Sequence, residues 1–426
     1  MIRIFKLNEL SDEAIIYRRD EVADVTAPVR EILSAVKAGG DSAVKAYTEK
    51  FDKVALNDLR VSDEEIDRAY ASVEPEFLNI LNKAAENITL FHKHQIRSSF
   101  IVNQEDGVVM GQKVIPLAKV GIYVPGGSAP LPSTVLMTAI PAHLAGCGRI
   151  IMCTPPQKDG SVNAYILAAA KIAGVTDIYK VGGAQAIAAL TYGTETIPRV
   201  DKIVGPGNAF VAEAKKQVYG KVAIDMIAGP SEILIISDGK TNPRVLAADM
   251  LSQAEHDKMA TAVLITDSAD LAEKVQNELE VQIPLLSRAE IARASIENNG
   301  KIIVTDSIRK AIDVANELAP EHLELCVDDP FDYLSSIVNA GSIFMGRNCP
   351  EALGDYMAGP NHTLPTIGTA RFSSPLSVDD FVKKSQYTYF TAEALKNLAP
   401  DVAYFAQKET LTAHAISAVV RLEEEK

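Results

Sequence analysis

Cysteine is scarce in this chain of 426 residues, which contains Cys147, Cys153, Cys326 and Cys349 and no C-x-x-C pair. So few thiols exclude a disulfide framework and favour buried thiols in a reducing compartment. A membrane-length apolar run is also lacking, and acidic residues appear near the N-terminus before any stretch that could act as a secretory signal. We therefore expect a cytoplasmic protein that does not bind a membrane.

Positive charge is lacking as well. The 42 lysines and arginines are outnumbered by 56 acidic residues, which leaves a formal net charge of −14. Such a surface disfavours binding to the phosphate backbone of a nucleic acid or to anionic lipid. Because 47% of the side chains are hydrophobic, a chain of this length can form two cores with a cleft between them. Composition thus indicates an enzyme-sized protein rather than a small binding module.

Two common nucleotide-binding motifs are missing, namely G-x-G-x-x-G and the phosphate loop that ends in G-K-[ST]. The nearest approach, Gly205-Pro-Gly207-Asn-Ala-Phe210, lacks the third glycine. Three glycine-rich turns nevertheless follow candidate strands: PGG at 125–127, GG at 182–183 and GPG at 205–207. Such turns can expose backbone N–H groups to a phosphate, or they can simply join strand to helix. Their occurrence together favours a ligand cleft.

Alternation of short β-branched runs with helical patterns begins near residue 119. The predicted strands are KVGIYV, RIIMCT, DIYKV, DKIV, SEILIIS, TAVLIT, KIIVT, HLELCV and GSIFM. This alternation predicts an α/β fold with mainly parallel sheets in two domains. Residues 1–110 read as a mainly helical N-terminal region, with a capping box at Ser62-x-x-Glu65, and residues 371–426 read as a helical C-terminal segment.

Polar residues with possible chemistry fall at a few places. Gln253 and His256 lie three apart on a predicted helix and can share one cation, although a glutamine ligand is unusual. Glu321 and His322 stand side by side where a strand begins, which suits general acid–base work but also fits an incidental loop histidine beside a glutamate.

Two further pairs of residues could have a functional role or only a structural one. Asp355 and His362 fall in a segment rich in glycine and proline, where they could face a cleft or only solvent. His414 is flanked by alanines and Glu409 precedes it, so by residue type alone they read as a core histidine and a charge on a helix surface.

Several longer strings together are similar to the histidinol dehydrogenase family. In order along the chain they are KVGIYVPGGSAPLPSTVLM, VGGAQAIAAL, VGPGNAFVAEAK, DMIAGPSEILI, LSQAEHD, ELAPEHLEL, GSIFMG, LGDYMAGPNHTLPT and AHAISAVVRL. The resemblance implies a homodimer with two Rossmann-like domains, at 111–230 on the NAD side and at 231–370 with the metal and catalytic residues. It also implies oxidation of L-histidinol through L-histidinaldehyde to L-histidine with two NAD, at the end of histidine biosynthesis.

Carried over position by position, the resemblance implies roles for individual residues and one zinc ion per subunit. It makes Glu321 and His322 the acid–base pair, Gln253, His256, Asp355 and His414 the zinc ligands, Tyr123, Gln185 and Asn208 the NAD contacts, and Ser231, His362 and Glu409 substrate contacts beside the zinc ligands and His322. It further implies that the C-terminal segment, with Glu409 and His414, reaches the site of the partner subunit.

Two other functions stay open at this point. A zinc hydrolase could use water activated by Glu321 at a similar ligand set, with the glycine turns as plain connections. A histidine-pathway sensor could bind the substrate without turnover, although it would need neither Glu321 nor His322.

Overall fold

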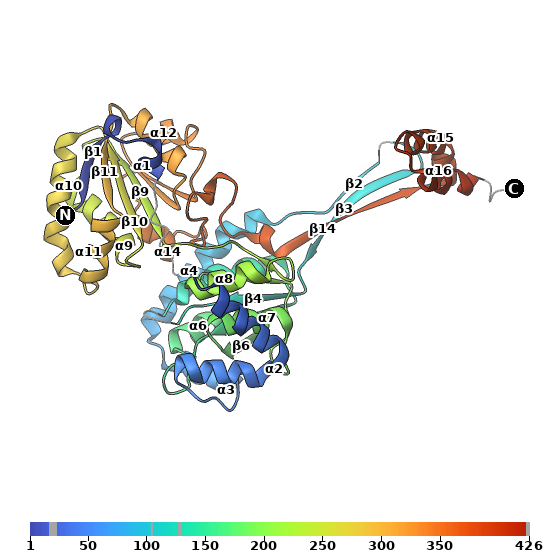
Figure 1. Ribbon diagram of the computed structural model, residues 1–426, viewed down its shortest axis with the longest axis horizontal. Coiled ribbons are helices and arrows are strands. Elements are labelled where there is room, and N and C mark those ends of the chain that lie inside the picture. The colour runs from blue at the N-terminus through green and yellow to red at the C-terminus, as the bar shows by residue number, and fades with distance from the viewer. Residues whose placement is uncertain (17–23, 104, 127–129, 423–426) are drawn as a thin grey trace. The chain divides into compact units, whose positions relative to one another are not determined.

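The computed structural model describes residues 1–16, 24–103, 105–126 and 130–422 (Figure 1). The chain divides into two compact units: Met1–Gln95 with Leu117–Phe381, and Ile96–Pro116 with Val382–Lys426. Gly127, the last glycine of the PGG turn, lies outside the described residues. Within the described ranges, no helix has the length and apolar character needed to cross a membrane.

The first unit contains a five-stranded parallel sheet in the order β6–β5–β4–β7–β8. Its strands are β4 (Lys119–Tyr123), β5 (Arg149–Thr154), β6 (Asp177–Lys180), β7 (Lys202–Val204) and β8 (Ala223–Ile224), and its crossover helices are α5 (Pro132–Ala145), α6 (Ala164–Ile172), α7 (Gly183–Tyr192) and α8 (Ala209–Val218). Along β5, Ile150 and Met152 pack into one core, whereas Ile151 and Cys153 pack into another. Burial on both faces explains why these strands read as unbroken apolar runs.

A six-stranded parallel sheet forms the rest of the first unit's framework, in the order β1–β11–β10–β9–β12–β13. Its strands are β1 (Arg3–Lys6), β9 (Glu232–Ser237), β10 (Thr261–Thr266), β11 (Lys301–Val304), β12 (His322–Cys326) and β13 (Ser342–Met345). Its helices are α1 (Asp12–Ile16), α9 (Pro243–Ala254), α10 (Ala269–Gln282), α11 (Ala289–Asn298), α12 (Ile308–Leu318), α13 (Phe331–Leu334) and α14 (Glu351–Tyr356). Two parallel α/β sheets in one chain confirm the predicted fold class.

The N-terminal region supplies helices to the first sheet and one strand to the second. Its helices are α2 (Thr26–Asp52), α3 (Asp63–Ser72) and α4 (Pro75–His92), and Ser62 caps α3 by accepting from the Glu65 N–H as predicted. Helix α2 is kinked at Gly40 and packs against α7 and α8. Strand β1 was not predicted, because a four-residue segment carries no periodic signal and is fixed only by pairing with β11.

The second unit joins two segments that are far apart in the sequence. An antiparallel sheet in the order β14–β3–β2 combines β2 (Phe100–Val102), β3 (Val108–Pro116) and β14 (Val382–Phe390), and the helices α15 (Ala392–Lys408) and α16 (Thr412–Val419) follow. Strand β14 corrects the prediction of a helical segment throughout residues 371–426. Its sequence VKKSQYTYF favours a strand once β3 is available as a partner.

Candidate active site

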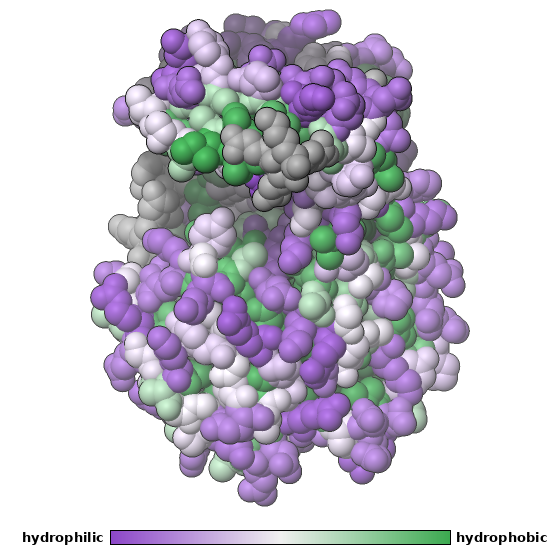
Figure 2. All heavy atoms as spheres, turned by 90° about the vertical axis from the view of Figure 1, so that its right-hand side faces the viewer, coloured by the Kyte–Doolittle hydropathy of each residue, from purple (hydrophilic) through white to green (hydrophobic). Residues whose placement is uncertain are grey.

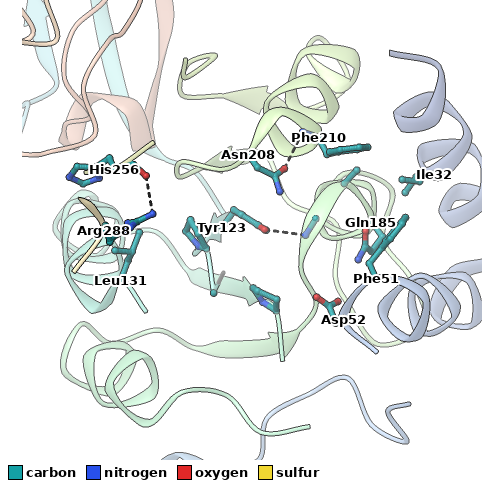
Figure 3. A pocket seen from close by; sticks show the side chains of 15 residues that line it. Ile32, Phe51, Asp52, Tyr123, Leu131, Gln185, Asn208, Phe210, His256 and Arg288 are labelled. Carbon is teal, nitrogen blue, oxygen red and sulfur yellow. Dashed lines mark hydrogen bonds between the residues drawn. The ribbon is translucent and has the colours of Figure 1, made fainter. Parts of the chain in front are cut away.

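A cavity of about 610 Å³ lies at the ends of strands in the five-stranded sheet and collects the three predicted NAD contacts (Figure 3). Tyr123 is the last residue of β4, Gln185 lies in α7, and Asn208 caps the start of α8. Loops beyond the carboxyl ends of parallel strands are where α/β folds usually bind ligands, and this volume falls within the ~300–1,000 Å³ common for cofactor pockets.

Each of these side chains is held by its own element. The hydroxyl of Tyr123 accepts a hydrogen bond from the Gly183 N–H at 3.0 Å, and burial raises the pKa of Tyr123 to about 12. The side-chain oxygen of Asn208 accepts from two backbone N–H groups of α8, which leaves its NH₂ group for a ligand. The side-chain oxygen of Gln185 is buried and has no hydrogen-bond partner among the described residues. A ligand that offers donors would satisfy it.

The turn before Asn208 is fixed by a buried ion pair. Lys215 and Asp225 contact each other with side chains only 2% and 1% exposed. Lys215 Nζ donates to the Gly205 carbonyl at 3.0 Å, and the Gly205 N–H donates to Asp225 Oδ2 at 2.7 Å. Gly205 has φ of +116°, and a Cβ there would collide with the Tyr123 carbonyl. The GPG turn is therefore a rigid wall of the site, which explains the need for its first glycine.

A smaller pocket of about 180 Å³, lined by more ionisable side chains, collects another seven predicted residues. It is lined by Ser231, Gln253, His256, Glu321, His322, Asp355 and His362, among others. His256 and Leu131 also line the larger cavity, so the two spaces meet at these residues. Helix α9 ends at Ala254, but a turn continues it, and the His256 N–H bonds to the Gln253 carbonyl at 3.2 Å. The expected proximity of Gln253 and His256 is thereby kept.

Glu321 and His322 are held by the backbone of one residue on the neighbouring strand. The Glu232 N–H donates to Glu321 Oε2 at 2.8 Å, and the Glu232 carbonyl oxygen lies 2.9 Å from Nδ1 of His322. A carbonyl can only accept, so this contact places the proton on Nδ1 and leaves Nε2 as the free base. Gln253 Nε2 also lies 2.9 Å from Nδ1, and because an NH₂ group cannot donate to a protonated nitrogen, this tautomer requires the Gln253 amide to be turned so that its oxygen faces Nδ1. Parallel pairing of β12 with β9 creates this arrangement.

Burial disfavours the charged form of both groups and so shifts their pKa values in opposite directions. It lowers the pKa of His322 to about 4, so the imidazole is neutral at pH 7. Burial also raises the pKa of Glu321 well above its ordinary value, and the Glu232 N–H opposes that shift. The neutral imidazole has a ring nitrogen free to accept a proton at pH 7, although its lowered pKa makes it a weaker base than an exposed histidine, whereas the raised pKa makes the Glu321 carboxylate a stronger base than an exposed one.

Acidic side chains face His322 across the pocket. Ligand atoms of His322, Glu351 and Asp355 all lie within 4.8 Å of one another, and His362 Nδ1 lies 3.4 Å from Asp355 Oδ1. Glu351 was missed from the sequence, although it lies four residues before Asp355 on α14 and thus shares its face. Its Oε1 is buried and has no hydrogen-bond partner among the described residues, and burial, followed by the charge of Asp355, raises the pKa of Glu351 to about 8.

Two predicted residues belong to the second unit. Glu409 follows α15 as its cap, and His414 lies in α16, and both are exposed there. The alanine neighbours of His414 favoured its interpretation as a core histidine. Its exposure rules that interpretation out. The other predicted site residues all lie in the first unit.

A cofactor-sized cavity, a polar pocket that it meets, and a buried glutamate–histidine pair together define an α/β enzyme of the dehydrogenase type. The sequence profile of the family described as histidinol dehydrogenase matches residues 17–422. The chain belongs to the histidinol dehydrogenase family, whose members are NAD-dependent oxidoreductases.

Individual relatives agree with this assignment. A histidinol dehydrogenase of Clostridium acetobutylicum is 58% identical over 401 residues, which cover 94% of this chain and 93% of the relative. A histidinol dehydrogenase of Listeria monocytogenes is 51% identical over 420 residues and covers 98% of both chains. The crystal structure of histidinol dehydrogenase from Elizabethkingia anophelis superposes with a TM-score of 0.94 at 42% identity, covering 99% of this chain and 98% of that one.

Proposed function

We propose that the two pockets form a single active site, in which histidinol is oxidised twice and the intermediate aldehyde stays bound. The observation that carries this proposal is the backbone of Glu232, which holds Glu321 and His322 together at the pocket that meets the NAD-sized cavity. Bound NAD would supply a hydride acceptor in each step. The family match does not favour the hydrolase or sensor alternatives.

His322 would act as the base in both oxidations. With its proton on Nδ1, its Nε2 can take the hydroxyl proton of histidinol as hydride leaves the same carbon. Water must then add to the aldehyde, and Glu321 would remove a proton from that water. Oxidation of the resulting hydrate needs a base again, and Nε2 of His322 is in place for it. Enclosure in the small pocket would protect the aldehyde from side reactions.

The polar pocket also fits a zinc ion. Gln253, His256 and Asp355 line it with oxygen and nitrogen donors, and the buried, unpartnered oxygen of Glu351 favours a cation nearby. We propose that these three residues hold zinc together with His414 of the partner subunit. When bound, zinc would serve as a Lewis acid that anchors the imidazole and amine of the substrate. Ser231 and His362 would contact the substrate from the same pocket, and Glu409 of the partner subunit would complete it.

A homodimer is supported by the surface of the second unit. Its buried hydrophobic residues, among those the structure describes, are Val108, Ala399, Ala403, Ala406, Ala415 and Ala418, which are too few and mostly too small to stabilise the 66 residues of this unit alone. Large hydrophobic side chains are exposed instead; from the start of α15 onward they include Leu398, Val402, Tyr404, Phe405, Leu411, Ile416, Val419 and Val420. Figure 2 shows hydrophobic side chains among hydrophilic ones on the face that it presents. Exposed apolar surface of this kind marks protein–protein interfaces.

Reduced-nicotinamide absorbance with limiting histidinol and excess NAD tests the overall reaction. We expect two NADH per histidinol, because an alcohol becomes a carboxylate by losing two hydrides. Removal of metal by a chelator should abolish NADH formation, and added zinc should restore it. One NADH per histidinol would mean release of the aldehyde, and none at all would contradict the proposed function.

Subunit exchange tests the shared site. Inactive His322→Asn and His414→Asn proteins, dissociated together and allowed to reassociate, should regain about a quarter of wild-type activity, because half of the dimers are mixed and each mixed dimer has one intact site. Each variant treated alone serves as the control and should stay inactive. If His414 instead served its own subunit, every site in the mixture would carry one defect, and no activity would return.

A further inference from the structure

A carboxylate without a partner lies in the wall of the larger cavity. Asp52 lines this cavity, and its Oδ2 is buried with no hydrogen-bond partner among the described residues. Burial raises the pKa of Asp52 to about 6. A buried acceptor without a donor opposes folding. The stability of the protein alone therefore does not explain why an aspartate occupies this position.

The position of Asp52 in its helix is also unfavourable. Asp52 is the last residue of α2, where the exposed carbonyl groups carry partial negative charge. A carboxylate would be stabilised at the other end of the helix. Two independent features thus oppose a negative charge here, and both would be offset by a ligand that donates hydrogen bonds to it.

The direction of the cavity indicates which part of the ligand reaches Asp52. His256 lies in both pockets and marks the end where chemistry takes place. Figure 3 shows His256 and Arg288 at one end of the cavity, Tyr123 in the middle, and Asp52 and Gln185 toward the other end. If NAD binds here as proposed above, its nicotinamide must lie near His256, so its adenosine half lies near Asp52.

We propose that Asp52 accepts hydrogen bonds from the hydroxyl groups of the adenosine ribose and thereby selects NAD over NADP. A carboxylate can only accept, and the ribose 2′-hydroxyl can donate to it. In NADP this hydroxyl is replaced by a phosphate, which offers no such donor and is repelled by the negative charge. The carboxylate itself is thus the element that rejects NADP.

The charges around the cavity agree with this assignment. Among the described lining residues, the only arginine or lysine is Arg288, and it lies at the His256 end. No lysine or arginine of the described lining therefore stands beside Asp52 to bind a 2′-phosphate. The buried side-chain oxygen of Gln185, which also lacks a partner, is a second acceptor on this side of the cavity. Two unsatisfied acceptors match a sugar better than they match a phosphate.

Replacement of Asp52 by asparagine tests the proposal through the choice of cofactor. We expect the KM for NAD to rise about tenfold with kcat changed less than about twofold, because the ribose is remote from the reacting carbon. The ratio of kcat/KM for NADP to that for NAD should rise by ~10–100-fold, since the repulsion is removed. A merely structural role would affect both cofactors alike and leave this ratio unchanged.

Two companion variants make the result decisive. Glu49→Gln removes one charge from an exposed position of the same helix and should leave the ratio unchanged, which excludes a general effect of charge. Asp52→Glu keeps the charge and should still reject NADP, and acceptance of NADP by this variant would contradict the proposal even if Asp52→Asn fails to fold. If the wild-type protein reduces NAD with histidinol but Asp52→Asn leaves both the KM for NAD and the ratio unchanged, the role of Asp52 is wrong. Absence of wild-type turnover would instead contradict the proposed function.

Discussion

Replacement of His322 by asparagine is expected to slow both oxidations by ~10²–10⁴-fold, the usual contribution of a positioned general base. His322 is buried among polar groups, and its pKa of about 4 keeps the imidazole neutral and ready to accept a proton at pH 7. Asparagine cannot accept a proton at any accessible pH. Both steps depend on this base, so neither should be spared.

Single-turnover measurements check this expectation, with histidinol for the first hydride transfer and with histidinaldehyde for the second. His143→Asn is a suitable control, because His143 is exposed on α5 and lines neither pocket. The control should retain wild-type rates. An unimpaired alcohol step in the His322→Asn protein would remove His322 from the role of base in that step.

Replacement of Glu321 by glutamine is expected to separate the two oxidations. Only the aldehyde step needs an activated water, so that step should slow by ~10²–10⁴-fold while the alcohol step changes by less than about tenfold. The amide oxygen of glutamine can still accept from the Glu232 N–H, so the local backbone should be preserved. With limiting histidinol, the first NADH per substrate molecule would then form rapidly and the second slowly.

Glu351→Gln provides the matched comparison. Glu351 Oε1 lies 3.7 Å from Nε2 of His322, so Glu351 is a second carboxylate close enough to compete for the role of base, and unlike Asp355 it is not a proposed zinc ligand. We expect this variant to show no selective loss of the aldehyde step. If Glu351→Gln produced the selective loss and Glu321→Gln slowed both steps equally, activation of water would have to be reassigned to Glu351.

Much of the framework could be predicted because its signals are local. Each predicted strand of the two parallel sheets is present, since strands covered on both faces read as short apolar runs. The cap at Ser62 is equally local: the structure has the bond from the Glu65 N–H to the Ser62 side chain, which is one half of the predicted capping box. By contrast, β1 and β14 exist because distant strands pair with them, and a window along the sequence does not contain their partners.

The residues of the candidate site likewise include some that the sequence predicted and some that it missed. Ten of the predicted residues line the two pockets, namely Tyr123, Gln185, Asn208, Ser231, Gln253, His256, Glu321, His322, Asp355 and His362. These residues were predicted from the strings that resemble a family. Spacing alone would not have selected them, because it left most of them with an ordinary structural interpretation. Glu351 and Asp52 were not predicted, because a glutamate after a proline and an aspartate at a helix end are common where no site exists.

The sequence by itself determined the residue types, the alternation of strands and helices, and the family. Only the tertiary structure showed that the backbone of Glu232 holds both Glu321 and His322, that Lys215 and Asp225 fix Gly205, and that Oδ2 of Asp52 is buried without a hydrogen-bond partner among the described residues. The physical reason is that burial and hydrogen bonding depend on neighbours that are distant in sequence. Composition and periodicity indicate the secondary structure that each segment prefers. A shifted pKa or a buried oxygen without a partner arises only when the segments have packed together.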